Sequence, residues 1–386
     1  MQFSNVVLAG IGVTVPPIRL TSDELEHQLD PLYRRLKLPQ GRLELMSGIR
    51  SRRLWHPGTV PSEPSIESAR AVMEAAGFNG VDVGALIHAS VCRDFLEPAT
   101  ASRVHHELGI SQNAWVYDVS NACLGVLNGA VQIATMIESG MISAGIVVGS
   151  ENSRPLTEAT VRMLNEDPSI TRRSVKPAFA SLTIGSGSCA WLLCHRRLRP
   201  NATPIQHAVC RANTRHHDLC RSDQDTAGAA MQPLMETDSE TLMAEGIATG
   251  VACLDELLSQ TGWSRDAVDR TVCHQVGIRH QASMLEAMGL SVENDAATFP
   301  VLGNTGSVAL PISVAAAVTL GRLAAGHQTA MLGIGSGINS VMIGTLWGDT
   351  VIAGNWAGLL DEFEKATTSG HVPAPHLRQH SAVATN

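Results

Sequence analysis

Residues 120–129, SNACLGVLNG, join a short apolar run at residues 115–119 to a largely apolar segment that extends to about residue 139. This pattern predicts a buried strand followed by a long helix, with Cys123 at the junction. A thiol at the start of a helix faces the positive end of the helix dipole and unpaired backbone N–H groups. We therefore expect a lowered pKa and a reactive thiolate at Cys123. A lone cysteine is more often a small core residue, so this motif alone does not establish catalysis.

The same alternation of strand and helix patterns extends in both directions from this junction. We expect strands at residues 6–13, 85–91, 115–119, 144–148 and 188–194, and helices at 65–76, 101–108 and 123–139. After a polar connection rich in Cys and His at residues 199–235, we expect helices at 241–258, 279–288 and 310–324, and strands at 270–274, 330–334 and 339–346. Alternating strands and helices predict an α/β fold with parallel sheets covered by helices. The order of elements suggests two related halves, residues 1–198 and 199–348, followed by a tail, 349–386, that we expect to be mobile apart from a short helix near 356–366.

Composition excludes several classes of protein. The 386 residues carry a formal net charge of -8 and no basic run longer than the RSRR of residues 50–53, which argues against a nucleic-acid binder. No stretch approaches the ~18 apolar residues of a membrane span, and the first residues lack a signal peptide, so we expect a cytoplasmic protein. The eight cysteines include no CxxC pair, and His216 and His217 fit a solvated loop, so no metal site is predicted.

Two further segments carry chemically useful side chains at the ends of expected elements. His274 ends the apolar run of VCHQVGIRH, residues 272–280, where side chains project into the crevice beyond a parallel sheet. Asn304 lies between two glycines in LGNTGSVALP, residues 302–311, and its amide can donate to a substrate oxygen. Taken singly, a core histidine and an ordinary turn explain these segments equally well.

A glycine-rich turn between two expected strands, LGIGSGINS at residues 332–340, can direct backbone N–H groups at a developing oxyanion. The N–H groups of Ser336 and Cys123 are the expected oxyanion hole. The turn is not a dinucleotide fingerprint, because the GxGxxG spacing and the following helix are both missing.

These four motifs, in this order, resemble the thiolase superfamily, most closely its ketoacyl-ACP synthase III branch, from about residue 3 to 347. The resemblance implies a thiolase fold, five-layered αβαβα with two duplicated halves, that works as a homodimer. It also implies that Cys123 forms an acyl-enzyme and that His274 and Asn304 stabilise the enolate or thioester oxygen of a second substrate. The implied partners are acyl-CoA or acyl-ACP, and no cofactor or metal is expected.

A fifth segment, SVCRDFLEPATAS at residues 90–102, resembles the OleA-type branch of acyl-CoA condensing enzymes. The resemblance implies that Glu97 reaches across the dimer and acts as the base. Joining two plain acyl-CoAs requires removal of an α-proton, whereas a decarboxylating synthase needs no base. A carboxylate in an apolar site gains basicity through desolvation. The alternative is a surface carboxylate at the start of the helix that opens near Thr100.

Other parts of the resemblance concern substrate binding. GIRSRRLW, residues 48–55, resembles the family near its pantetheine and nucleotide entrance, so Arg50 is a candidate for contact with CoA phosphates or, alternatively, with the dimer surface. The two glycines around the catalytic amide, Gly303 and Gly306, are further candidates for substrate binding. Where relatives commonly have a histidine, this chain has Leu302, which removes a polar neighbour and predicts a different substrate preference or product release.

The sequence thus predicts an acyltransferase that joins two fatty acyl-CoAs by a non-decarboxylative Claisen condensation through an acyl-cysteine, giving a 2-alkyl-3-keto acid. The alternatives are a decarboxylating 3-oxoacyl-ACP synthase III that uses malonyl-ACP, a pyrone-forming ketosynthase, or a non-catalytic partner subunit.

Overall fold

Two β-sheets organise the protein, whose computed structural model describes residues 1–222 and 235–368. The first sheet has the order β15-β1-β7-β6-β4-β5, with β8 also beside β1. Its strands are β1 (Val6–Thr14), β4 (Ala85–Ala89), β5 (Trp115–Val119), β6 (Ala144–Glu151), β7 (Gly187–His195), β8 (Thr203–Pro204) and β15 (Val351–Gly354). The second sheet has the order β12-β13-β14-β9. Its strands are β9 (His207–Ala212), β12 (Arg270–Cys273), β13 (Gln328–Gly335) and β14 (Asn339–Leu346).

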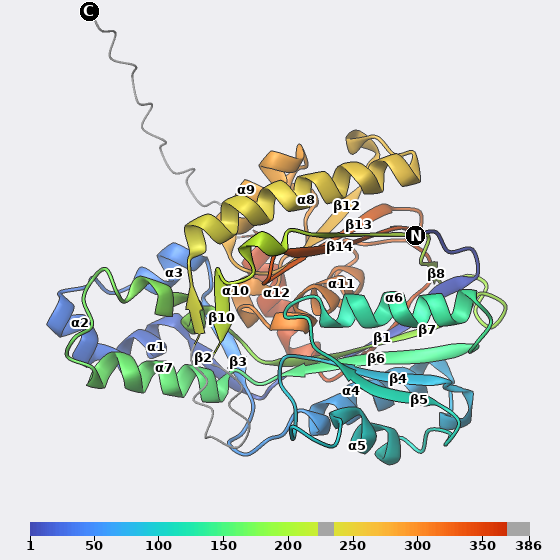
Figure 1. Cartoon of the computed structure of the whole chain (residues 1–386), viewed down its shortest axis with the longest axis horizontal. Helices are drawn as coiled ribbons and strands as arrows, with labels where there is room; N and C mark the ends of the chain where they lie inside the picture. Colours follow the sequence, from blue (N-terminus) through green and yellow to red (C-terminus); the bar gives the residue numbers. More distant parts are fainter. Residues whose placement is uncertain (223–234, 369–386) are drawn as a thin grey trace, which may run out of the picture.

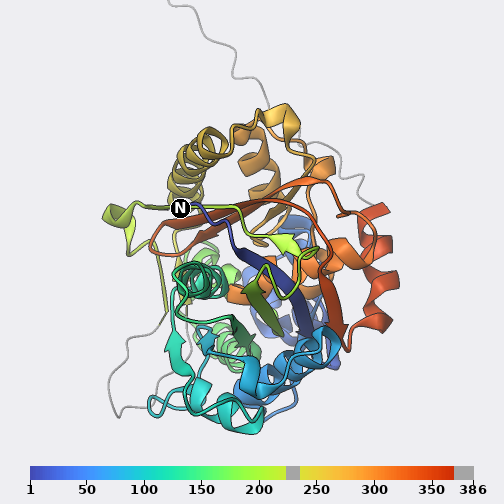
Figure 2. The same cartoon turned by 90° about the vertical axis from the view of Figure 1, so that its right-hand side faces the viewer.

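Helices cover both outer faces of the two sheets and fill the space between them (Figure 1 and Figure 2). Helices α4 (Ser62–Ala76) and α5 (Thr100–Glu107) pack on the outer face of the first sheet. Helices α8 (Ser239–Thr261) and α9 (Ile278–Met288) pack on the outer face of the second. Helices α6 (Gly125–Glu138) and α11 (Ala309–Thr319) share one hydrophobic core with strands of both sheets. The predicted five-layered αβαβα thiolase fold is confirmed.

The central helix α11 shows why the middle layer is apolar on all sides. Every residue from Ala309 to Ala317 is buried. A helix between two sheets has no solvent-facing side, so it lacks the polar stripe of a surface helix.

Strand direction is mixed in both sheets. Strands β4, β5 and β6 run parallel, as do β12 and β13, whereas β7 is antiparallel to β6 and β1. Strands β13 and β14 form an antiparallel hairpin. The connection between them is only three residues long, 336–338, which is too short for the crossover that parallel neighbours need.

The two halves repeat the same order of elements with one difference. The first half follows β1, α4, β4, α5, β5, α6, β6 and β7, and the second follows β9, α8, β12, α9, α11, β13 and β14. No strand of the described second half corresponds to β5, because the chain after α9 forms a single turn, η5 (Val292–Asn294), and one isolated bridge between Thr271 and Asp295. In the first sheet, β5 stands last in the strand order and is an edge strand.

A third region, beside the two sheets, was not predicted from the sequence (Figure 1). It shares its own hydrophobic cluster. Its elements are β2 (Ile18–Thr21), α1 (Ser22–Gln28), α2 (Asp30–Leu36), α3 (Arg42–Ser47), β3 (Ser51–Leu54), α7 (Arg154–Glu166) and η2 (Lys176–Thr183). Near it lie the short helix α10 (Phe299–Leu302) and a two-stranded ribbon of β10 (Cys220–Ser222) and β11 (Met235–Thr237).

The expectation of a mobile tail is wrong for residues 351–354, and the short helix expected near 356–366 corresponds to a helix at residues 360–368. Strand β15 pairs in parallel with β1, and the side chains of Trp356 and Phe363, the latter in α12 (Leu360–Thr368), are buried in the central core. Residues 369–386 lie outside the described residues. The polar connection at residues 199–235 is also partly ordered, since β9 supplies the fourth strand of the second sheet. The second half of β9 is exposed, so its polar residues resembled a loop.

The observed ends of the helices differ slightly from the predicted ones, most clearly in α11. This helix stops at Thr319 rather than near residue 324, and Gly321 adopts a left-handed φ of 68° just beyond it. No helix within residues 1–222 and 235–368 is long and apolar enough to cross a membrane.

Candidate active site

A tight turn carries Cys123 from the end of β5 to the start of α6. Ala122 has a left-handed φ of 44°, and the backbone N–H of Leu124 donates to the carbonyl of Asn121 at 2.9 Å. The Asn121 side chain is held in turn by a 2.8 Å hydrogen bond to Asn128 one helical turn into α6. The predicted position of Cys123 at a strand-to-helix junction is confirmed.

The glycine-rich hairpin of the second half packs directly on this junction. A Cβ at Gly335 would lie 3.6 Å from the Cys123 nitrogen and 3.0 Å from Leu124 Cγ. A Cβ at Gly333 would lie 2.5 Å from Leu127 Cδ1. The close approach of the two halves therefore leaves no room for a side chain at Gly333, where a Cβ would also lie 2.7 Å from the Val341 carbonyl, and little room at Gly335. Ser336, the next residue of the hairpin, is half-buried, and its role with Cys123 in an oxyanion hole remains a prediction.

His274 directly follows β12, next to the strand that carries this hairpin. Its backbone N–H donates to the carbonyl of Leu332 in β13 at 3.1 Å. The side chain is 5% exposed, and its Nδ1 has no hydrogen-bond partner among the described residues. Burial lowers the pKa of His274 to about 3, and the neighbouring His280 adds to this effect. The imidazole is therefore neutral near pH 7 and has one N–H to donate.

Asn304 is fixed by hydrogen bonds on its backbone and on one side of its amide. Its N–H donates to Thr183 O at 2.9 Å, its carbonyl accepts from Gly185 N at 2.8 Å, and its Oδ1 accepts from Gly306 N at 3.0 Å. The bond to Oδ1 orients the side chain so that Nδ2 is the group left to donate to a substrate oxygen. Gly303 has a φ of 68°, and a Cβ there would lie 2.7 Å from Thr183 O, so the backbone itself demands glycine.

The loop that carries Asn304 also reaches the start of α6. Ser307 Oγ lies 3.0 Å from the carbonyl of Ala89 at the end of β4. A Cβ at Gly125, two residues after Cys123, would lie 3.5 Å from Ser307 Cβ. The Asn304 loop and the hairpin beside His274 therefore both approach the start of α6, where Cys123 lies. That the three side chains act on one substrate remains a prediction.

The predicted lowering of the Cys123 pKa is wrong for the free chain. Burial raises the pKa of this thiol to about 12, with smaller contributions from Glu151 and Cys220. Desolvation of a thiolate outweighs the attraction of the helix dipole, because Cys123 precedes the N-cap Leu124 and lies outside the first turn of α6.

Known proteins of similar sequence include acyl-CoA alkyltransferases and ketoacyl synthases. The C-terminal model of 3-oxoacyl-[acyl-carrier-protein] synthase III matches residues 258–344. An acyl-CoA:acyl-CoA alkyltransferase from Shewanella oneidensis is 36% identical over 352 residues, which cover 90% of this chain and all of the relative. The same enzyme from Xanthomonas campestris is 34% identical, again with 90% and 100% coverage. The chain belongs to this family, the OleA alkyltransferases.

Solved structures agree with this membership. The structure of Xanthomonas campestris OleA with bound lauric acid and lauroyl-CoA, a variant with a serine in place of one cysteine, superposes with a TM-score of 0.84 at 33% identity. The match covers 89% of this chain and all of that one. Variants of the same Xanthomonas enzyme with a substituted histidine or glutamate superpose equally well.

The structure gives the positions of three further residues that the resemblance singled out. Glu97 is exposed on a surface loop of the single chain, so its own subunit supplies no apolar pocket for it. Arg50 is half-buried at the start of β3 and accepts a backbone hydrogen bond from Ser22 at 2.9 Å. Leu302 is 1% exposed and packs in the central core. The roles proposed for these residues in this OleA family member remain predictions.

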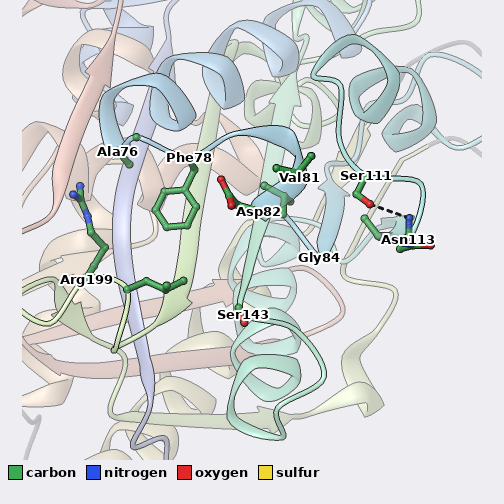
Figure 3. A pocket seen from close by; sticks show the side chains of 13 residues that line it. Ala76, Phe78, Val81, Asp82, Gly84, Ser111, Asn113, Ser143 and Arg199 are labelled. Atoms are coloured by element: carbon green, nitrogen blue, oxygen red, sulfur yellow. Dashed lines mark hydrogen bonds between the residues drawn. The ribbon is translucent and has the colours of Figure 1, made fainter.

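A cavity of about 720 Å³ is not part of this site (Figure 3). Its lining includes residues just before β4, β5 and β6, namely Gly84, Ala114 and Ser143. The amino ends of these strands face away from the carboxyl ends, where Cys123 lies. No group of three or more His, Cys, Asp or Glu residues suited to a metal ion is found in the described part of the chain.

Sequence reasoning missed several buried polar residues around the site. Gln275 accepts from the backbone N–H groups of Thr298 and Phe299, at 2.8 and 3.2 Å, and so holds the segment that leads to Asn304. Glu151, the last residue of β6, is 5% exposed and accepts from several backbone groups. Its signal in the sequence was an acidic residue at the carboxyl end of an apolar strand, the same position that drew attention to His274.

Proposed function

We propose that this chain catalyses a non-decarboxylative Claisen condensation of two fatty acyl-CoAs to a 2-alkyl-3-keto acid through an acyl-enzyme on Cys123. The observation that carries the proposal is the meeting of the segments of Cys123, His274 and Asn304 at one helix start, in a chain matched over 90% of its length by acyl-CoA:acyl-CoA alkyltransferases. The ligands in the Xanthomonas structure, lauric acid and lauroyl-CoA, indicate the substrate class.

Acylation is the first step. The sulfur of Cys123 attacks the thioester carbon of an acyl-CoA, and the backbone N–H groups of Cys123 and Ser336 stabilise the oxyanion. The carbon–sulfur bond to CoA then breaks, and the thiol proton of Cys123 ends on the departing CoA sulfur. The raised thiol pKa means that the proton leaves during attack rather than before it.

Condensation is the second step. A second acyl-CoA binds with its thioester oxygen near the His274 imidazole and the Asn304 amide, Glu97 removes an α-proton, and the carbanion attacks the acyl-cysteine carbon. The Cys123 thiolate leaves and is reprotonated, and water then cleaves the 2-alkyl-3-ketoacyl thioester to the keto acid and free CoA. A neutral His274 suits this step, because it can share a proton with a developing enolate without an energetically costly buried cation.

The base role of Glu97 requires a second subunit, so we propose that the active form is a homodimer. Glu97 lies beside two exposed apolar side chains, Phe95 at 63% and Leu96 at 56%. Strand β5 also ends the first sheet with an open edge, at which Trp115 is 54% exposed. A partner subunit against the Glu97 loop would bury Phe95 and Leu96 and give Glu97 the desolvated surroundings that raise the basicity of a carboxylate, and pairing at the β5 edge would cover Trp115.

The chemistry of both steps is thioester exchange and carbon–carbon bond formation, so we propose that the enzyme needs no metal or redox cofactor. The acyl donor is proposed to be a CoA thioester, and acyl-ACP is the alternative donor because synthase III proteins are more distant relatives, at 23% identity for the one from Neisseria meningitidis.

The proposal is tested by incubating the full chain with lauroyl-CoA alone. We expect release of free CoA together with a C24 2-alkyl-3-keto acid, or the ketone left after its decarboxylation, both detected by mass spectrometry. Cys123→Ala is the matched control and should abolish acyl-enzyme and product.

Two results would overturn the proposal. Turnover that requires malonyl-CoA or malonyl-ACP and releases carbon dioxide would assign the chain to the decarboxylating synthases. Turnover that persists in Cys123→Ala would remove the acyl-cysteine from the mechanism.

A further inference from the structure

Glu151 connects two loops that approach the site from different parts of the chain. Its Oε1 accepts from Ser307 Oγ at 2.6 Å, from Ser307 N at 3.3 Å and from Val91 N at 3.1 Å. Its Oε2 accepts from Cys92 N at 3.4 Å. One buried carboxylate at the end of β6 thus joins the loop that follows β4 to the loop that precedes α11.

Each of these loops carries a residue of the proposed mechanism. Val91 and Cys92 begin the loop that leads to Glu97, and Ser307 lies three residues after Asn304. Gly306 packs directly on the carboxylate side chain, since a Cβ there would lie 3.0 Å from Glu151 Cγ and 3.1 Å from its Cδ. Both loops are therefore held in place by contacts with the same side chain, the carboxylate of Glu151.

Glu151 has no ion-pair partner among the described residues, so its charge acts on neighbouring titratable groups. It raises the pKa of Cys123, after the larger effect of burial, and it raises the pKa of Cys92 in the same way. It also opposes the lowering of the His88 pKa that burial causes, together with Asp118 and Asp94. A negative charge that disfavours the Cys123 thiolate works against acylation, so its contribution has to lie in another step.

We propose that Glu151 is a positioning residue for the condensation step, which holds the loop of Glu97 and the loop of Asn304 in a fixed relation to Cys123. This inference rests on the proposed function, since it assigns Glu151 to the step in which the base and the enolate-stabilising amide must act on one substrate. A carboxylate suits the task because its two oxygens accept several hydrogen bonds and donate none when ionised.

The hydrogen bonds of Glu151 predict different outcomes for glutamine and for alanine at this position. Glutamine keeps the length of the side chain and an Oε1 that can accept from Ser307 and Val91, and it loses only the long contact to Cys92 N. Alanine removes all of these acceptors and leaves buried N–H groups unpaired, so the two loops lose their common anchor. Removal of the charge in either variant should lower the pKa of Cys123, because Glu151 raises it in the native chain.

The test compares Glu151→Gln and Glu151→Ala in the full chain with three measurements. Acylation of Cys123 by lauroyl-CoA is followed by mass spectrometry in single turnover, product formation is followed at steady state, and the pH dependence of iodoacetamide labelling is read from the Cys123 peptide. For Glu151→Ala we expect acylation at least as fast as in the native chain, and turnover reduced about 100-fold, the order expected for a displacement of catalytic groups by about 1 Å. For Glu151→Gln we expect turnover within about fivefold of the native chain, since the same hydrogen bonds can form.

Labelling of Cys123 distinguishes positioning from a general structural role. Both variants should label faster than the native chain at each pH below the thiol pKa, about tenfold for each unit by which the pKa falls. A merely structural defect would instead slow acylation and condensation together and would not shift the labelling profile in this direction.

Ser307→Ala provides a second route if Glu151→Ala does not fold. It removes the 2.6 Å hydrogen bond to Glu151 on the Asn304 side, together with the 3.0 Å contact to the Ala89 carbonyl, and leaves the charge of Glu151 in place. We expect slower condensation, unchanged acylation and an unchanged labelling profile. Native turnover in Glu151→Ala, or a loss in Glu151→Gln as large as that in Glu151→Ala, would overturn the positioning role. A native chain that never acylates Cys123 would instead overturn the proposed function itself.

Discussion

Replacement of Asp295 by asparagine should stabilise the protein, and by an amount that depends on pH. Asp295 is 7% exposed, and its Oδ1 accepts from Thr271 Oγ1 at 2.8 Å and from Cys273 N at 3.0 Å. Its Oδ2 accepts from Gln281 Nε2 at 2.7 Å. Burial nevertheless raises the pKa of Asp295 from 3.8 to about 6, against these hydrogen bonds. The protonated form is therefore favoured in the folded state, and ionisation at higher pH destabilises it.

The size of the effect follows from the two pKa values. Below pH 3.8 the carboxyl is protonated in both the folded and the unfolded chain, and it contributes no difference. As pH rises through 3.8 and then 6, folding stability falls by ~1.36 kcal/mol per pKa unit, which reaches roughly 3 kcal/mol at pH 8 and only about 1 kcal/mol at pH 4.5. Asparagine does not titrate and can keep the bonds to Thr271 and Cys273, while the Gln281 amide can turn to accept. The gain in stability of Asp295→Asn over the native chain should therefore be about 2 kcal/mol larger at pH 8 than at pH 4.5.

Urea unfolding at both pH values measures this difference, at one fixed protein concentration because subunit association also affects stability. Any constant effect of the substitution on packing cancels in the comparison. Asp266→Asn, at an exposed carboxyl four residues before β12, is the matched control and should shift stability by less than ~0.5 kcal/mol at either pH. An equal gain for Asp295→Asn at both pH values would refute the reasoning, since it would mean that the buried carboxyl titrates as it does in the unfolded chain.

Three further outcomes are expected from the same structure. Iodoacetamide labelling of Cys123 in the free chain should keep accelerating up to pH 10, because the thiol pKa of about 12 lies above that range, and a plateau near pH 7 would contradict the effect of burial. Gly335→Ala should slow acylation of Cys123 by about 10–100-fold with little change in folding, because its methyl group would lie 3.0 Å from Leu124 Cγ and would push on the residue next to Cys123, and single-turnover mass spectrometry would show native acylation if the hairpin does not serve that site. Phe363→Ala should lower the free energy of unfolding by ~3–5 kcal/mol, because this side chain is 1% exposed in the central core, and an unchanged urea midpoint would mean that α12 does not contribute to the fold.

The sequence was most informative where a residue type and its position both had one physical explanation. The strands at 115–119 and 339–346 were predicted to the residue, because short apolar runs bounded by turn signals are read directly from periodicity. The glycine-rich turn at residues 332–340 and the glycines that flank Asn304 were recognised in the sequence, and the structure gives a reason at two of them: a Cβ at Gly335 would lie 3.0 Å from Leu124 Cγ, and Gly303 has a positive φ.

What the sequence could not provide depended on partners that are distant along the chain. Strand β15 pairs with β1 more than 330 residues earlier, and no local pattern in VIAG identifies that partner. The lowered pKa predicted for Cys123 was wrong for the same reason, because a helix start is visible in the sequence whereas burial and the nearby Glu151 are not. The exposure of Glu97 likewise appears only when the loop is seen on the surface of one chain.

The pKa values of the two titratable side chains in the site, Cys123 and His274, shift in directions that both favour the uncharged form. Burial raises the pKa of the Cys123 thiol and lowers that of the His274 imidazole, so the free site holds a neutral thiol and a neutral imidazole. A thiolate–imidazolium pair would cost too much free energy in these surroundings before substrate arrives. In the proposed mechanism, negative charge develops on the oxygen of the bound acyl thioester beside preorganised N–H groups while the thiol loses its proton, so the cost of charge separation is offset at the moment of attack. The same neutral imidazole can then donate to the enolate in the second step, and one electrostatic arrangement therefore serves both halves of the reaction.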